Sequence, residues 1–257
     1  MEMSGNAVCM HTSLRSFGPI EGGADTIIDA YLTEGCTLMV PTFAHGIFGI
    51  DLPPDFRPAR NGVDYDDPSG SRPSHDRTYS PSTNEIDGSM GTLPRVVLER
   101  PDRIRGAHPL SSFAAIGPLA HRLIDRQRPL DIYAPLAALA KLDGFVILAG
   151  VGLERMTLIH LAEKRAGRTL FRRAANGPDG EVIIVETGSC SEGFVHLEPM
   201  LRPIRREQLV GESLWQIFPA MAALNITTHA IRRNPRITHC GQDCIRCDHQ
   251  VAGGPIF

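Results

Sequence analysis

Short apolar runs and one periodic stretch organise the first part of the chain. Ala7–Met10 is an uninterrupted apolar run of the kind that forms a buried strand, and Leu38–Val40 is a second one, closed by Pro41. Between them, apolar side chains recur at the i, i+3, i+4, i+7 spacing of an amphipathic helix: Ala24, Ile27, Ile28 and Tyr31. The pattern predicts a strand, a helix and a strand in that order.

The same reasoning predicts further elements along the rest of the chain. Phe145–Ala149 is a continuous apolar run that ends in Gly150-Val151-Gly152, which indicates a buried strand followed by a tight turn. We expect helices over about 93–99, 154–165 and 207–224, and a β-branched strand over 181–185. The tail from Arg232 is expected to be irregular.

Residues 51–90 differ from their surroundings. They are rich in Pro, Ser, Asp and Gly and lack apolar periodicity, so we expect a long loop or flap. A loop of this length within a compact domain is usually functional or disordered.

Composition and charge narrow the class of protein. The chain has 257 residues, of which 42% are hydrophobic, and this suits one large α/β domain spanning 1–257. A net charge of −3 argues against general nucleic-acid binding. No apolar run reaches the ~18 residues of a membrane span, and no signal peptide is visible. Six cysteines in a chain this long do not suggest a disulfide framework, so we expect a cytoplasmic protein with reduced thiols.

The predicted helix after the Phe145–Ala149 strand carries a candidate catalytic set. Thr157, His160 and Glu163 are three apart, so they lie along one side of the helix. An imidazole is suited to general-base work near neutral pH, a carboxylate can orient it, and a hydroxyl can stabilise an oxyanion. The alternative is a surface His–Glu pair that only supports the helix. A zinc site of the HExxH type is excluded, because no second histidine follows at i+4.

The segment after the first strand is a candidate ligand loop. Ser13–Gly23 lies between a predicted strand and a predicted helix, and its glycines would let backbone amides approach a phosphate. It matches neither GxGxxG nor a P-loop, and an ordinary strand–helix turn is the alternative.

Taken in order, several segments resemble the aminoglycoside 3-N-acetyltransferase family. The matching pieces are His11–Gly18, Gly22–Asp25, Gly35–Phe43, Met90–Pro94, Arg105–Pro109, Ser112–Gly117, Asp143–Gly152, Thr157–Glu163 and Cys190–Phe194. The resemblance implies an α/β fold with a mixed central sheet and flanking helices, and acetyl-coenzyme A bound in a cleft opposite an aminoglycoside.

The resemblance also assigns roles to residues. It places a first group against the pantetheine and pyrophosphate of the coenzyme: Ser13, Leu14, Arg15, Ser16, Phe17 and Gly18. It places a second group along the coenzyme: Arg105, His108, Ser112 and Phe113. His160 matches the essential histidine of the family, and Glu163 matches its acidic neighbour.

The activity that the resemblance implies is transfer of an acetyl group to the 3-amino group of an aminoglycoside. We expect direct transfer, with His160 as the general base and Thr157 or backbone amides at the oxyanion. A cysteine nucleophile is the competing idea, but nothing in the sequence activates Cys9, Cys36 or Cys190. An acetyltransferase for a different amine and a catalytically silent ligand-binding relative remain as alternatives.

A polycationic acceptor requires carboxylates. Residues 51–90 contain several acids, and we expect Asp66 and Asp67, together with Glu163, to hold ammonium groups while Tyr79 packs on a sugar face. The alternative is a solvated loop in which Tyr79 is an anchor.

The tail contains a CxxxCxxC pattern flanked by histidines. Cys240, Cys244, Cys247 and His249 form a candidate structural zinc site, with free or packed thiols as the alternative.

Overall fold

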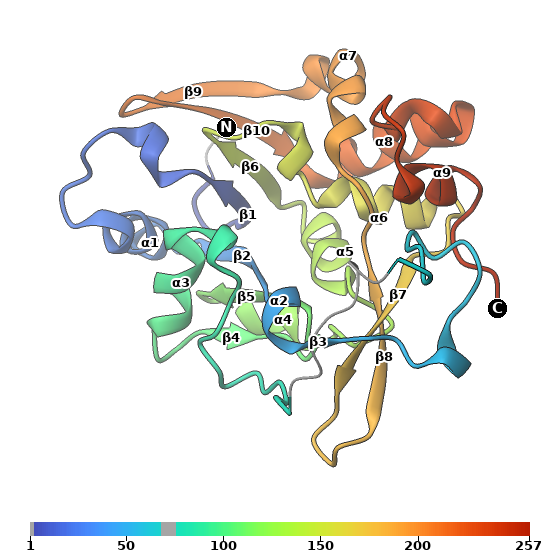
Figure 1. The fold of residues 1–257 in the computed structure, drawn as a ribbon. Helices are drawn as coiled ribbons and strands as arrows, with labels where there is room; N and C mark the ends of the chain where they lie inside the picture. Colours follow the sequence, from blue (N-terminus) through green and yellow to red (C-terminus); the bar gives the residue numbers. More distant parts are fainter. Residues whose placement is uncertain (1–2, 68–75) are drawn as a thin grey trace.

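A seven-stranded mixed sheet forms the centre of the protein, which the computed structural model describes for residues 3–67 and 76–257 (Figure 1). The strand order is β4-β5-β2-β1-β6-β10-β9. β1 is parallel to β2 and β6, whereas the outer strands pair antiparallel. The strands are β1 (Ala7–Thr12), β2 (Thr37–Phe43), β4 (Ile104–Arg105), β5 (Ser111–Ile116), β6 (Phe145–Ala149), β9 (Arg206–Val210) and β10 (Ser213–Pro219). The expected mixed sheet is confirmed.

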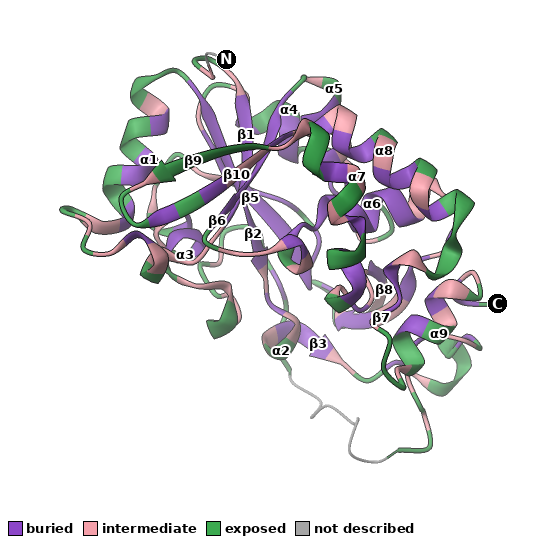
Figure 2. Ribbon diagram, turned by 90° about the horizontal axis from the view of Figure 1, so that it is seen from above, coloured by how far each residue is buried: buried purple, intermediate pink, exposed green. Residues whose placement is uncertain are grey.

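Helices cover both faces of this sheet, which explains why its central strands are continuous apolar runs. Successive residues of a strand point to opposite faces, so Ala7 and Cys9 enter one core and Val8 and Met10 enter the other. The first core contains residues of the helices at 120–124, 134–141, 158–165 and 220–233, and the second contains residues of the helices at 23–33 and 92–99. Figure 2 shows the central strands buried between these layers.

The helices mostly follow the apolar spacing. α1 buries the four residues that predicted it, whereas α6 begins at Leu158, after a 3-10 turn at Leu153–Arg155. The α-helices are α1 (Gly23–Thr33), α2 (His45–Phe48), α3 (Thr92–Glu99), α4 (Ala120–Ile124), α5 (Ala134–Lys141), α6 (Leu158–Arg165), α7 (Glu198–Leu201), α8 (Ala220–Arg233) and α9 (Ile245–Val251). The other 3-10 turns are Leu14–Phe17, Pro54–Phe56, Gly88–Met90, Glu192–Leu197, Arg202–Ile204 and Pro235–Thr238. None of the described helices combines the length and apolar character needed to cross a bilayer.

A small antiparallel sheet lies beside the main one (Figure 1). It consists of β3 (Gly49–Ile50), β7 (Phe171–Asn176) and β8 (Val182–Thr187). The described part of 51–90 contains two short 3-10 turns and isolated β-bridges at Ala59 and Thr78; residues 68–75 lie outside the described residues. Pairing of β3 with β7 brings the start of this loop to the β7–β8 hairpin.

Two expectations near the C-terminus are wrong. Residues 206–219 form the β9–β10 hairpin, and the helix begins only at Ala220. β10 pairs with the free edge of β6, and Gly211 supplies the positive φ of the turn (+59°). The tail is also more regular than expected, since it contains α9.

Candidate active site

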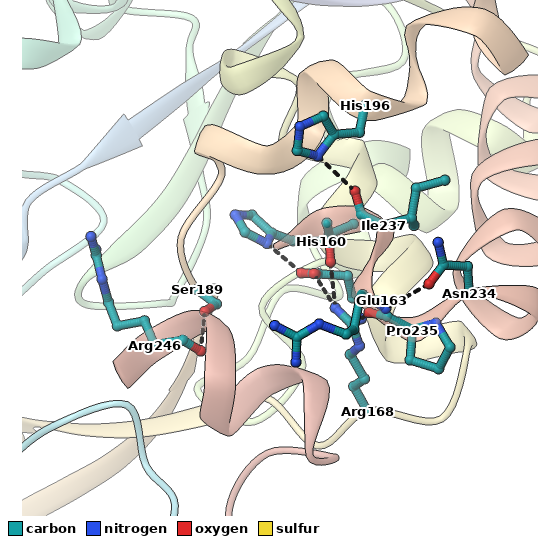
Figure 3. A network of polar contacts seen from close by, with 11 residues as sticks. His160, Glu163, Arg168, Ser189, His196, Asn234, Pro235, Ile237 and Arg246 are labelled. Carbon is teal, nitrogen blue, oxygen red and sulfur yellow. Dashed lines mark hydrogen bonds and ion pairs between the residues drawn. The ribbon is translucent and has the colours of Figure 1, made fainter. Parts of the chain in front are cut away.

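His160 lies on α6 and is the first residue in a chain of buried polar contacts that continues beyond this helix (Figure 3). Its Nδ1–H donates to Glu163 Oε2 at 2.8 Å, and the other carboxylate oxygen accepts from Arg168. Arg168 in turn donates to Thr238 Oγ1 at 2.8 Å and to the carbonyl oxygen of Pro235. Glu163 is only 1% exposed and His160 8%, so the pair is not the surface pair of the alternative interpretation.

The imidazole ring of His160 is fixed from several sides. Tyr133 stacks on it with an interplanar angle of 9°, and Phe194 meets it edge-on with the ring centroids 4.8 Å apart. Gly188 passes so close that a Cβ atom there would lie 2.8 Å from His160 Cδ2. The ring therefore has one orientation, in which Nδ1 is bound and Nε2 is left for a ligand.

His160 and Thr157 both line a cavity of about 390 Å³. The cavity lies at the carboxyl ends of the central parallel strands, the usual place for ligands in α/β sheets. Its other lining residues are His11, Pro41, Phe43, His45, Met90, Ser111, Tyr133, Glu154, Arg155, Arg173, Thr187, Gly188, Ser189, Ser191, Phe194 and Arg246.

The titratable groups near the cavity fit a histidine base better than a cysteine nucleophile. Burial, assisted by the charge of Arg155, lowers the pKa of His11 to about 4, so this ring is neutral at physiological pH. Burial raises the pKa of the Cys9 and Cys190 thiols, which disfavours their nucleophilic thiolates. No cysteine is among the described residues that line the cavity.

The segment Ser13–Gly18 lies directly after His11 and Thr12 at the end of β1. It forms a 3-10 turn in which Ser16 Oγ donates to Ser13 O and contacts Ser213 Oγ, both at 2.7 Å. None of its six residues lines the cavity, so the expected coenzyme contacts of Ser13, Leu14, Arg15, Ser16, Phe17 and Gly18 stay a prediction.

The second group assigned to the coenzyme is buried and already bonded, which corrects that assignment. His108 is 0% exposed, with Nδ1 accepting from the backbone amides of Leu110 and Ser111 and Nε2–H donating to Glu186 O. Phe113 is also 0% exposed, in the core. These two side chains hold the fold and are not accessible to a coenzyme.

Arg105 and Ser112 are likewise structural. Ser112 Oγ accepts from Arg105 Nε at 3.0 Å and donates to Thr42 O. The Arg105 guanidinium also donates to backbone carbonyls of the loop, at Thr83 and Glu85. The pair therefore fastens the 51–90 loop to the sheet.

Tyr79 is engaged inside the protein and lines neither the His160 cavity nor the one beside Asp66 and Asp67. Its hydroxyl donates to Gly106 O at 2.6 Å, its ring meets Phe48 edge-on, and the Arg105 guanidinium lies 5.1 Å from its centroid. With only 9% exposure, it is the loop anchor of the alternative interpretation.

A second cavity, of about 690 Å³, adjoins the first through shared residues Arg173 and Arg246. Asp66 and Asp67 line it, so they lie near the site but not in the His160 cavity. Glu163 lines neither cavity, and both of its oxygens are bound internally. The expectation that Glu163 also holds a substrate ammonium group is therefore wrong.

The tail cysteines converge, but with a different fourth member. The Sγ atoms of Cys240, Cys244 and Cys247 gather with that of Cys190. His249 is excluded from the set, because its Nδ1 accepts from the Gly62 amide at 3.0 Å.

Four residues around His160 received no role in the site from the sequence: Tyr133, Arg168, Gly188 and Phe194. The Cys190–Phe194 piece was matched to the family, yet its spacing gives no sign that Phe194 meets His160. Only proximity in the folded chain reveals these roles.

The fold and the site define a class of α/β protein in which a histidine, backed by a buried carboxylate, faces a ligand-sized cavity at the ends of parallel strands. The chain belongs to the aminoglycoside 3-N-acetyltransferase family, whose model matches residues 9–232. It is 34% identical over 172 residues to aminoglycoside N(3)-acetyltransferase VIII of Streptomyces fradiae, covering 63% of this chain and 56% of that relative. It therefore spans little more than half of that relative.

Other relatives are covered more completely. Aminoglycoside N(3)-acetyltransferase IV of Salmonella sp is 27% identical over 246 residues, which cover 91% of this chain and 83% of the relative. A solved structure of aminoglycoside acetyltransferase AAC(3)-IVa, a histidine-to-alanine mutant in complex with a gentamicin, has a TM-score of 0.75 at 25% identity. That similarity covers 97% of this chain and 91% of the solved one.

Proposed function

We propose that the protein is an acetyl-coenzyme A-dependent N-acetyltransferase that modifies the 3-amino group of aminoglycosides. The observation that carries the proposal is the His160 ring, which faces the cavity while its Nδ1 is bound to the buried Glu163 carboxylate. Family membership supplies the reaction class.

The geometry suits a histidine that accepts a proton from the acceptor amine. The Nδ1–H bond to Glu163 fixes the tautomer, so the lone pair is on Nε2, and the carboxylate stabilises the imidazolium that forms. The amine nitrogen attacks the thioester carbonyl, the carbon–sulfur bond breaks, and the proton on His160 passes to the departing thiolate. The products are an N-acetylated amine and free coenzyme A. Thr157, which lines the same cavity, is the proposed donor to the oxyanion.

The two cavities suggest where each substrate binds. The coenzyme is assigned to the end of β1, where Arg155 lines the first cavity and Ser13–Gly18 follows His11. A structural neighbour with 20% identity, AAC-IIIb, was solved as a binary complex with CoASH. The acceptor is assigned to the second cavity, in which Asp66 and Asp67 offer carboxylates for ammonium groups.

One observation favours a second candidate acceptor. Among the described residues, the charges lining the second cavity are balanced rather than acidic. The carboxylates are Asp51, Asp64, Asp66 and Asp67, and the guanidinium groups are Arg57, Arg172, Arg173 and Arg246. An amine that also carries an anionic group matches this balance, which keeps an acetyltransferase for a different amine as the second candidate.

Release of free thiol from acetyl-coenzyme A, measured with a panel of acceptors, tests both candidates. The panel contains aminoglycosides with a 3-amino group, the same compounds already acetylated there, and amines that carry a carboxylate. Turnover of the first group alone, with the product acetylated at the 3-amino group, supports the main proposal. Turnover of the third group alone supports the second candidate, and no turnover with any acceptor contradicts both.

A further inference from the structure

Four thiols from two distant parts of the chain converge beside the candidate active site. Cys247 lies in the first turn of α9, Cys244 is its N-cap and Cys240 precedes it by five residues, whereas Cys190 lies in the segment after β8. All four Sγ atoms lie within 4.8 Å of one another. Cys190 and Cys247 are buried, at 5% and 3% exposure, whereas Cys240 and Cys244 are half-buried.

We propose that Cys190, Cys240, Cys244 and Cys247 form a structural zinc site. In a tetrahedral Zn(Cys)₄ site the zinc–sulfur distance is about 2.3 Å, which places the sulfur atoms about 3.8 Å apart. The Sγ atoms of Cys247 and Cys240 are 3.6 Å apart, close to this value. Four thiolates fill every position of tetrahedral zinc, so the site is closed and takes no part in chemistry.

The neighbouring side chains support this ligand set. The two tail histidines are engaged elsewhere: His239 Nε2 pairs with Asp248, and His249 Nδ1 accepts from the Gly62 amide. A disulfide joins only two sulfurs at about 2.05 Å and leaves the other two thiols unexplained. A single ion accounts for the convergence of all four.

The zinc site fastens the wall of the catalytic cavity to the tail. Ser189 and Ser191, on either side of Cys190, line that cavity. Arg246, which lies between two of the other ligands, lines both cavities, and its carbonyl oxygen accepts from Ser189 Oγ at 3.2 Å (Figure 3). Metal binding thus ties Cys190 directly to the turn that carries Arg246, and it does so whether or not the protein transfers acetyl groups.

The direct test is the metal content of untagged protein purified without chelator. We expect about one zinc ion per chain. Cys190→Ser is expected to lower zinc affinity by more than about 100-fold, since even the loss of a hydrogen-bond partner of a ligand costs about 10–100-fold. Cys36→Ser, which alters a buried cysteine outside the cluster, and His249→Ala are the matched controls and should keep the ion.

Cobalt(II) provides a measurement that needs no substitution. In protein whose metal has been removed, added cobalt should show the ligand-field bands of tetrahedral coordination and a thiolate charge-transfer band, and zinc should displace it. Hydrogen exchange in 187–191 and 239–251 should slow when zinc is restored, because the ion joins these segments.

Specific results overturn the proposal. Metal-free protein that gives no tetrahedral cobalt spectrum rules the site out, as does a count of free thiols two short of the six cysteines after denaturation without reductant. Loss of zinc in His249→Ala with retention in Cys190→Ser rules out the ligand set.

Discussion

Replacing Glu163 by glutamine tests the role of the buried carboxylate most directly. Arg168 can only donate to the residue at 163, so the amide oxygen of glutamine turns toward Arg168 and its NH₂ group toward His160. The amide then donates to Nδ1, and the proton of the imidazole moves to Nε2. A ring protonated on Nε2 cannot accept a proton from the substrate amine.

The size of the effect follows from this change of tautomer. General-base catalysis contributes about 10²–10⁴-fold, and the corresponding carboxylate-to-amide change in a serine protease costs about 10⁴-fold. We therefore expect kcat of Glu163→Gln to fall by about 10²–10⁴-fold, or roughly 3–5 kcal/mol in the activation barrier. Binding of the coenzyme should not change, because Glu163 lines neither cavity.

The same substitution lowers stability, which must be separated from catalysis. It leaves the Arg168 guanidinium, whose side chain is 5% exposed, without its buried counter-ion, at a cost of about 3–5 kcal/mol. The double variant Glu163→Gln/Arg168→Met removes that charge and should recover much of the free energy of unfolding. Arg168→Met also frees the amide at position 163 to turn its oxygen toward Nδ1, so the double variant is a control for stability alone. The loss of kcat in Glu163→Gln is assigned to the tautomer where chemical denaturation shows that this single variant is folded.

Thiol release under saturating substrates measures kcat, and chemical denaturation measures the free energy of unfolding. His160→Ala is the reference for loss of the base. If Glu163→Gln is folded and keeps kcat within about ten-fold of the unsubstituted protein, the carboxylate does not set the tautomer, and the assignment of His160 as the base loses its main support.

Three further predictions concern the ring, the acceptor and pH. Gly188→Ala pushes a Cβ atom to 2.8 Å from His160 Cδ2 and should lower kcat by up to about 100-fold, since a 1 Å misplacement can cost that much. Asp66→Asn/Asp67→Asn should raise the KM for an aminoglycoside by about 2- to 30-fold, from 0.2–1 kcal/mol for each exposed charge pair. Burial lowers the pKa of His108 to about 4, whereas an imidazole in the unfolded chain titrates near ~6.5. Between these pH values the unfolded state binds the additional proton, so stability should fall as pH falls, by up to about 1.4 kcal/mol per pH unit.

Each of these predictions has a control. A normal kcat in Gly188→Ala would show that the ring is not confined there. Gly88→Ala is the matched control, because Gly88 also lacks a positive φ and has open space at its Cβ position. The KM for acetyl-coenzyme A should stay constant in the Asp66/Asp67 variant; a parallel rise would contradict separate sites. His108→Asn keeps an acceptor for the backbone amides and should reduce the pH dependence of stability; the part that remains comes from His11, whose pKa is also lowered to about 4.

Local sequence determined much of the framework. Continuous apolar runs are enough to predict the buried strands β1 and β6. The 3.6-residue spacing of apolar side chains is enough to predict α1. His160 and Glu163 belong to the same category, because residues at i and i+3 on a helix are neighbours in any fold. The hairpin at 206–219 escaped this reasoning, since a short apolar segment becomes a strand only when a sheet edge, here that of β6, is available to pair with it.

The tertiary structure decided everything that depends on distant segments. It placed Arg168 between Glu163 and the 235–238 turn, brought Gly188 and Phe194 against the imidazole, and completed the cysteine cluster with Cys190 instead of His249. In the folded chain, Arg105, His108 and Tyr79 are buried and hydrogen-bonded to backbone carbonyl oxygens, so they support the fold. Residues that are far apart in the sequence can form hydrogen bonds and packing contacts only when the fold brings them close together in space. The spacing of residues along the chain does not determine these distances.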